Sequence, residues 1–214
     1  MEEYFDILAK GGPLVIPIAL CSVLALAVFV ERLLALRMER VFPSRLADAV
    51  MDLLKERKHD AAMSLVKQHQ SPLSALIISC LDSTKLGRAG AKERMEEVGS
   101  VQVGVLARYV SALSTVATVS PLLGLLGTVT GMIKVFKSVA VVDNPQISQL
   151  AGGIWEALLT TVAGLAVAIP AYLAFRYLES RIERIASSLQ EYGIALLETV
   201  FPMEQESDQN RSDA

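Results

Sequence analysis

The sequence predicts an all-α membrane protein with three transmembrane helices, because its apolar residues are abundant and gathered into blocks. Hydrophobic residues make up 52% of the 214 positions, and the mean hydropathy is +0.44, unusual for a soluble domain. Residues 13–30 and 109–133 carry no charge, and between Asp143 and Arg176 the only charged residue is Glu156. Each block reaches the roughly 18–20 residues that a helix needs to cross about 30 Å of hydrocarbon.

Composition also excludes several classes of function. A net charge of −3 is too small to indicate a nucleic-acid partner. Cys21 lies in an apolar block and Cys80 in a polar segment, so a disulfide framework is not expected. No Cys and His spacing suggests a metal site, and no nucleophile elbow, phosphate loop or paired-carboxylate pattern is present. We therefore expect no enzyme, no cofactor and no metal.

The distribution of Lys and Arg predicts the orientation in the membrane. Residues 31–108 hold 13 of the 20 basic residues, whereas the N-terminus offers only Lys10. The positive-inside rule then places the N-terminus in the periplasm and the C-terminus in the cytoplasm. The expected segments are a periplasmic N-terminus (1–12), transmembrane helix 1 (13–34), a cytoplasmic helical segment (35–107), transmembrane helix 2 (108–137), a periplasmic loop with the start of helix 3 (138–151), transmembrane helix 3 (152–176), a cytoplasmic helix (177–201) and a disordered tail (202–214).

The first span is aliphatic and nearly free of polar groups, so it can face lipid on all sides. Pro13 and Pro17 lie near its start, where a missing amide donor does least harm. A cleaved signal peptide is the alternative, but Glu2, Glu3 and Asp6 precede the span where a signal peptide carries positive charge.

The cytoplasmic segment reads as short amphipathic helices. Apolar residues recur at helical spacing at Leu46, Val50, Leu53 and Leu54, then at Met63 and Val66 behind a possible cap at Asp60, and then at Leu73, Leu76, Ile77 and Cys80. Ser71 followed by Pro72 predicts an N-cap and first helical position. Gly87 and Gly90 are expected to break the helical pattern.

The second span is unusual for its hydroxyl groups. From about Ala91 there is no strong helix stop, so we expect one helix through Phe136, about 70 Å long. It carries Ser111, Ser114, Thr115, Thr118, Ser120, Thr128 and Thr130, several of them on one face. Such hydroxyls either bond to a neighbouring helix or line a wet path, and the residues alone leave both open.

Small residues predict that the second and third spans pack as a tight pair. The second span has Gly124, Gly127 and Gly131, and the third has Gly153, Ala157, Thr161, Gly164 and Ala168. Pro121 and Pro170 each predict a kink within membrane depth.

The third helix is expected to begin early and to continue far beyond the membrane. Asn144 followed by Pro145 predicts its cap. Beyond Arg176 a heptad seam continues for nearly three heptads at Leu178, Ile182, Ile185, Leu189, Tyr192 and Leu196. Packing against the same chain and packing between subunits are both compatible with this seam.

Glu156 stands alone at the edge of the third span. Burying a carboxylate in hydrocarbon costs at least a few kcal/mol, so it should face a bundle interior or water. Thr160, one turn further on, and the adjacent Thr161 offer hydroxyls that could bond the acid or help to pass an ion. The alternative is an interfacial acid at the outer surface that pairs with Lys134.

Two stretches resemble the signature segments of the ExbB/TolQ branch of the MotA/TolQ/ExbB proton channel family: "SPLLGLLGTVTGMIKVF" (120–136) and "GGIWEALLTTVAGLAVAIPAY" (152–172). The order of elements is similar as well. The MotA branch, with four spans and no matching acid in the third, fits less well.

The resemblance implies a homopentameric ring in the bacterial inner membrane. Its pore would enclose the single transmembrane helices of two ExbD/TolR-like partner subunits. Proton passage would then power a TonB- or TolA-like protein that acts on the outer membrane, in transport or envelope maintenance. The family's acid maps onto Glu156 and its threonines onto Thr161 and Thr128; with Thr160, Thr118 and Ser114 they form the expected ion pathway.

Departures from the family pattern keep alternatives open. Trp155 stands where a small residue is common, and Thr160 adds a hydroxyl compatible with sodium as well as protons. A non-conducting membrane scaffold, held together by its polar faces, is the alternative of a different class. A substrate transporter is disfavoured, because three spans carry no inverted repeat or pair of broken helices.

Overall fold

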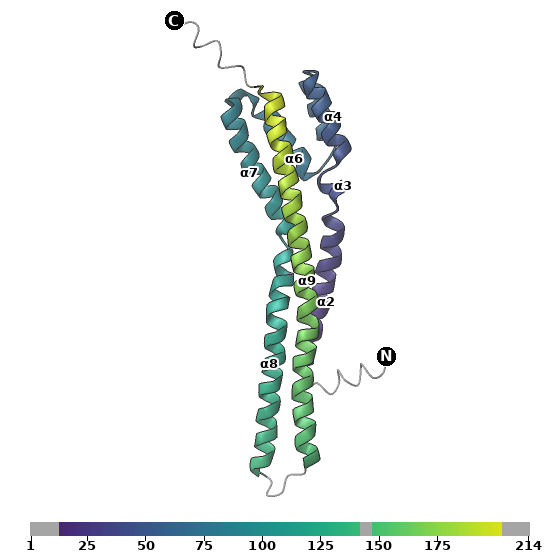
Figure 1. The fold of residues 1–214 in the computed structure, drawn as a ribbon, viewed down its shortest axis with the longest axis vertical. Coiled ribbons are helices and arrows are strands. Elements are labelled where there is room, and N and C mark those ends of the chain that lie inside the picture. Colours follow the sequence, from purple (N-terminus) through teal and green to yellow (C-terminus); the bar gives the residue numbers. More distant parts are fainter. Residues whose placement is uncertain (1–12, 142–146, 203–214) are drawn as a thin grey trace. The chain divides into compact units, whose positions relative to one another are not determined.

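The computed structural model describes residues 13–141 and 147–202. Within these ranges the chain is almost entirely helical and no strand occurs, which confirms the all-α prediction (Figure 1). Three helices of this part are long and apolar enough to cross a membrane: α2 (Val15–Ala35), α8 (Val110–Val141) and α9 (Ile147–Val200). Predictions for residues 1–12, the Asn144 cap and residues 203–214 lie outside the described residues.

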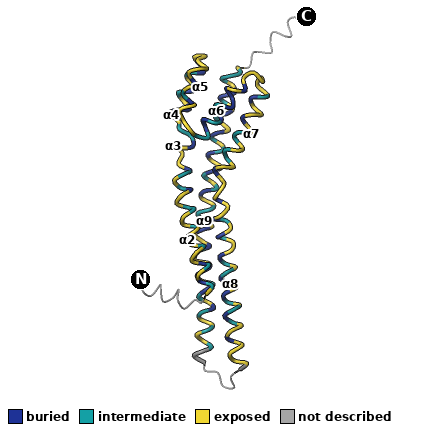
Figure 2. Tube along the Cα trace, turned by 180° about the vertical axis from the view of Figure 1, so that it is seen from behind, coloured by how far each residue is buried: buried dark blue, intermediate teal, exposed yellow. Residues whose placement is uncertain are grey.

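The chain divides into two compact units. The membrane unit contains the described residues up to Leu33 together with those of Tyr109–Glu179, and the second unit contains Leu34–Arg108 with the described residues from Ser180 onward. The continuous helix α9 contributes to both. In the membrane unit α2 exposes most of its large apolar side chains, among them Ile16, Val23 and Leu26 (Figure 2). That exposure is expected of a helix that faces lipid.

The expected single helix from Ala91 through Phe136 is wrong. Helix α7 (Gly87–Ala107) ends before α8 begins at Val110. At the break the Arg108 amide donates to the Val105 carbonyl at 3.4 Å, and the Ala112 amide donates to the Tyr109 carbonyl. These bonds reach back three residues instead of four, so they tighten the backbone without any proline or glycine. The break coincides with the boundary between the units.

The second unit is built from short helices and the end of α9. Its elements are α3 (Met38–Val41), α4 (Ser44–Lys55), α5 (His59–Lys67), α6 (Pro72–Asp82), the 3₁₀ turn η1 (Thr84–Leu86) and α7. Their fully buried side chains include Val50, Val66, Leu73, Ile77 and Cys80. The apolar periodicity therefore located this core correctly.

Helix starts in this unit were predicted with mixed success. Ser71 is the N-cap of α6, and its Oγ accepts a hydrogen bond from the Ser74 amide at 3.1 Å. The expected cap at Asp60 is wrong: Lys58 is the N-cap of α5, and Asp60 lies inside its first turn. Gly87 begins α7 with a φ of +73°, but Gly90 lies inside that helix and does not break it.

The heptad seam of α9 is buried by its own chain. Ile185, Leu189 and Leu196 are at most 3% exposed. The Tyr192 hydroxyl donates to the Ala47 carbonyl at 3.0 Å, and its ring meets Phe42 edge-on with centroids 5.7 Å apart. The interpretation of a helix packed in the same chain's bundle is therefore supported along this stretch.

Candidate functional site

Glycines of α8 bring its backbone against α9 within the membrane unit. A Cβ atom added at Gly131 would lie 2.7 Å from the Cβ of Ala157, and one at Gly124 would lie 2.9 Å from the Thr160 carbonyl oxygen. One at Gly127 would collide with the Thr160 side chain. A larger residue at these places would have to displace atoms of α9, so α8 and α9 approach each other closely at these glycines.

The α9 side of this seam is equally close. At Gly164 a Cβ would lie 2.5 Å from the Ser120 carbonyl oxygen, and at Gly153 it would collide with the Val135 side chain. Ala168 is 5% exposed. The small residues predicted to form the packing stripe therefore lie at or next to the contact.

Two adjacent threonines of α9 point their hydroxyls at backbone oxygens in the seam. Thr161 Oγ1 donates to the Gly124 carbonyl of α8 at 3.0 Å, a hydrogen bond that links the two helices. Thr160 Oγ1 donates to the Ala157 carbonyl at 2.7 Å. The expectation that Thr160 could bond the Glu156 carboxylate is therefore wrong in this structure, because its proton is already used one turn back.

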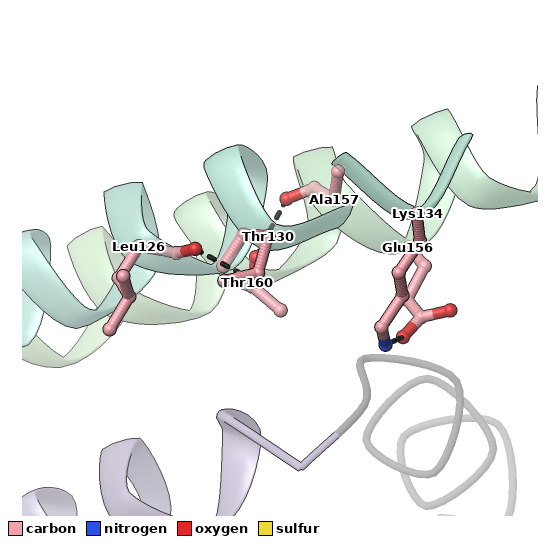
Figure 3. A network of polar contacts seen from close by, with 7 residues as sticks. Leu126, Thr130, Lys134, Glu156, Ala157 and Thr160 are labelled. Atoms are coloured by element: carbon pink, nitrogen blue, oxygen red, sulfur yellow. Dashed lines mark hydrogen bonds and ion pairs between the residues drawn. The ribbon is translucent and has the colours of Figure 1, made fainter. Parts of the chain in front are cut away.

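Glu156 lies at one end of this seam and pairs with a cation of α8. Its Oε1 atom is 3.8 Å from Lys134 Nζ (Figure 3), and the two side chains are 37% and 65% exposed. This is the pairing that the interfacial alternative anticipated. It joins two helices, and Glu156 lies about two and a half turns after the start of α9.

A pocket of about 290 Å³ surrounds the pair. It is lined by Pro13, Leu14, Leu126, Gly127, Thr130, Gly131, Lys134, Glu156 and Thr160. Thr130 Oγ1 donates to the Leu126 carbonyl at 2.8 Å, as Figure 3 shows, and lies 3.1 Å from the Gly127 carbonyl oxygen. Thr130 and Lys134 were not predicted as pathway residues, although their spacing of four residues places them on one face of α8.

The other predicted pathway residues do not line this pocket. Thr118 Oγ1 donates to the Ser114 carbonyl at 2.9 Å, and Thr128 Oγ1 donates to the Leu125 carbonyl at 2.7 Å. Most hydroxyls of α8 thus bond neither across to another helix nor to one another, but to their own backbone. Ser120 differs: it is fully buried, and its Oγ has no hydrogen-bond partner within the described part of the chain.

Metal-ligating residues do not cluster in the described ranges, where no group of three or more His, Cys, Asp or Glu side chains could hold an ion. The chemistry available at the site is therefore that of one carboxylate, one ammonium and two hydroxyls. Such a set can bind or release a small cation.

The sequence profile of the MotA/TolQ/ExbB proton channel family matches residues 58–191, more than half of the chain. The chain belongs to the MotA/TolQ/ExbB proton channel family. The matched region runs from the start of α5 into the distal part of α9, and it includes the seam, Lys134 and Glu156. The three apolar helices and the family together identify a multi-pass inner-membrane protein.

Relatives from several organisms belong to the ExbB/TolQ branch of this family. The chain is 30% identical over 183 residues to a protein named ExbB-like 3 from Synechocystis, covering 85% of this chain and 87% of that protein. It is 27% identical over 208 residues to the biopolymer transport protein ExbB of Salmonella typhimurium, covering 92% and 83%. It is 36% identical over 104 residues to the Tol-Pal system protein TolQ of Haemophilus influenzae, covering 49% and 44%.

The chain is also 30% identical over 179 residues to an ExbB homolog of Methanothermobacter thermautotrophicus. The aligned region covers 83% of this chain and 63% of that protein. The family and fold class predicted from the sequence are therefore confirmed at this level.

Proposed function

We propose that this protein is the ring-forming subunit of an ion-driven motor in the inner membrane. In this proposal five copies surround the transmembrane helices of an ExbD/TolR-like partner dimer, and a cation moves past Glu156 under the membrane potential. Each elementary charge that crosses releases about 2.3 kcal/mol per 100 mV. The motor passes this energy to a TonB- or TolA-type protein that acts on the outer membrane.

The observation that carries the proposal is the position of Glu156. Its carboxylate lies beside the tight α8–α9 seam, in a pocket with the Thr130 and Thr160 hydroxyls and one counter-charge. Placing a carboxylate at the edge of a membrane span costs free energy, and acids in such positions usually have a function. Binding a cation is the function that this set of groups supports. The names of the relatives, which refer to biopolymer transport and to the Tol-Pal system, support the same function.

The expected partners follow from the same proposal. The partner dimer would supply the second acid of the pathway, since α8 and α9 offer no acid other than Glu156 between Val110 and Arg176 among the described residues. In the proposed orientation the N-terminus lies in the periplasm and the C-terminus in the cytoplasm. We propose no enzymatic activity and no cofactor.

Glu156→Gln tests the motor directly. The amide is nearly isosteric with the carboxylate but cannot take up a charge, so we expect intact assembly with loss of energy-dependent function in cells. Full activity of this variant, at normal expression, would remove Glu156 from the mechanism. The mass of the detergent-solubilised protein tests the ring, because a monomer or dimer is incompatible with a pore of five subunits.

A non-conducting scaffold is the second candidate, and one observation favours it. The hydroxyls of Thr115, Thr118, Thr128 and Thr130 are all engaged by their own helix. A wet path would need such groups to face water or an ion. Glu156→Gln separates the two candidates, since a scaffold tolerates the change. A sodium-driven motor would give the same loss, but its function would depend on external sodium.

A further inference from the structure

We propose that Lys134 is a gating residue of the Glu156 site: its ammonium group acts as a tethered cation that neutralises the carboxylate whenever no transported cation is bound. This inference rests on the proposed function of Glu156. It adds a gate, because an incoming proton or metal cation must displace the Lys134 side chain before the acid can carry it.

The geometry of the pair supports an exchangeable contact. The Nζ–Oε1 distance of 3.8 Å lies within the range of an ion pair but is too long for a strong hydrogen bond. The Lys134 side chain is 65% exposed, so its flexible stem has room to swing away. An ammonium in this position holds the carboxylate weakly enough to be replaced.

Lys134 is also the only charged or hydrogen-bonding partner that Glu156 has within the described residues. The two hydroxyls of the same pocket cannot substitute for it, because Thr130 and Thr160 donate to the Leu126 and Ala157 carbonyls (Figure 3). Without Lys134 the pocket would hold one uncompensated negative charge beside an apolar layer. Such a charge raises the local concentration of cations and eases their entry.

The seam fixes the two helices that carry the pair. Gly131 lies three residues before Lys134 and packs against Ala157, the residue after Glu156. Because the backbones are in close contact here, rotation of the Lys134 side chain can break the pair without separating the helices. The contact joins residues 22 positions apart on two helices, unlike pairs such as Arg94–Glu97 and Lys92–Glu96, each of which lies within one turn of a helix.

The test is cation flux through the full-length protein, reconstituted together with the ExbD/TolR-like partner dimer of the proposed function, in vesicles of phosphatidylethanolamine and phosphatidylglycerol. A potassium diffusion potential drives entry, and internal dyes report protons and sodium separately. We expect Lys134→Gln to raise the flux of the transported cation about two- to fivefold, the size typical of losing a solvent-accessible ion pair. Lys134→Arg keeps the tethered charge and should stay close to the wild-type flux.

Lys137→Gln is the matched control, since Lys137 lies on the same helix, is exposed, and has no ion pair among the described residues. It should leave the flux unchanged. The double variant Lys134→Gln with Glu156→Gln should be as inactive as Glu156→Gln alone, because the gate acts only through the acid. The solubilised mass of every variant should equal that of the wild type.

The outcomes distinguish the gate from the proposed function. If Glu156→Gln abolishes flux while Lys134→Gln matches or falls below the wild type, the gate is overturned and the motor stands. A rise in Lys137→Gln equal to that in Lys134→Gln also overturns the gate, because it would reflect surface charge alone. If Glu156→Gln conducts as well as the wild type, both proposals fail.

Discussion

Polar side chains in the membrane unit are satisfied mainly by the helix that carries them. Thr118, Thr128 and Thr130 each return a hydrogen bond to a carbonyl three or four residues earlier. This arrangement lowers the cost of placing hydroxyls in an apolar layer without committing them to a neighbour. Two threonines of α9 differ, because they reach the Gly124 carbonyl of α8: Thr161 Oγ1 donates to it at 3.0 Å, and Thr160 Oγ1 lies 3.5 Å from it. These contacts help to fix the register of the two helices.

Cys80 provides a pH-dependent test of the second unit. Burial in α6 raises the pKa of its thiol from 9.0 to about 11. The folded protein therefore holds this proton more tightly than the unfolded chain does. The stability linked to it is present below about pH 9 and is lost as the pH rises towards 11.

In a Cys21→Ser background we expect maleimide to modify Cys80 at least about tenfold more slowly in the folded protein than in urea, because few thiolates form and access is blocked. The rate of labelling near pH 8 measures this. Equal rates in the two states would contradict the buried position of the thiol.

Single residues were predictable from sequence where the chemistry was local. Ser71 was identified as a cap because serine followed by proline has a specific meaning at a helix start. Glu156 was singled out as a candidate because placing a lone acid beside 19 uncharged residues costs free energy; its role stays a prediction. The hydrogen bonds of Thr160 and Thr130 were not predictable, since several carbonyls lie within reach of a helical threonine and only the three-dimensional packing selects among them.

Because α8 and α9 pack closely, substitutions of their glycines should differ in their effect on stability. Gly127→Ala adds a methyl group that would collide with the Thr160 side chain, and overpacking of this kind costs about 1–3 kcal/mol. Gly152 on α9 has no neighbouring atom within 4 Å of an added Cβ. Gly152→Ala should therefore be neutral or slightly stabilising, because alanine favours a helix.

Thermal unfolding of the two variants in the same detergent measures this difference. We expect a lower transition temperature for Gly127→Ala only. Equal transition temperatures would show that the helices can separate at Gly127 without cost, contrary to the contact described here.

At the scale of whole elements the sequence predicted most of the fold. Uncharged length located α2, α8 and α9, and apolar periodicity located the core of α4 and α6. The break between α7 and α8 was missed because residues 107–110 contain no helix breaker. A tertiary contact is made at the break itself, where the Arg32 guanidinium lies 4.8 Å from the centroid of the Tyr109 ring.

Orientation of the whole molecule is testable with single cysteines. In a variant lacking Cys21 and Cys80, we introduce Ser138→Cys near the end of α8 or Ser187→Cys in the distal part of α9; both serines are exposed. The positive-inside rule places position 138 in the periplasm and position 187 in the cytoplasm. A membrane-impermeant maleimide should label only position 138 in spheroplasts, and both after lysis. Labelling of position 187 in intact spheroplasts would reverse the assigned topology.

Organisation into two units was only partly predictable from composition, because α9 runs through both units without a break. The sequence indicated membrane and cytoplasmic segments by charge, and the unit boundaries after Leu33 and Glu179 fall close to where charge begins. Periodicity alone could not show which helices pack against the heptad seam of α9. Burial of Ile185 and Leu196 by the same chain answers that question for a single subunit.

The glycine seam also has a mechanical consequence. Where Gly124 and Gly131 meet α9, backbone touches backbone or a methyl group, and no long side chain lies between the helices to act as a spring. The packed segments of α8 and α9 should therefore move together as one rigid unit under load, with little deformation at their contact. A force applied to one helix would be transmitted directly to the other. Sliding against a neighbouring molecule would then have to take place on the faces of α8 and α9 that point away from their contact.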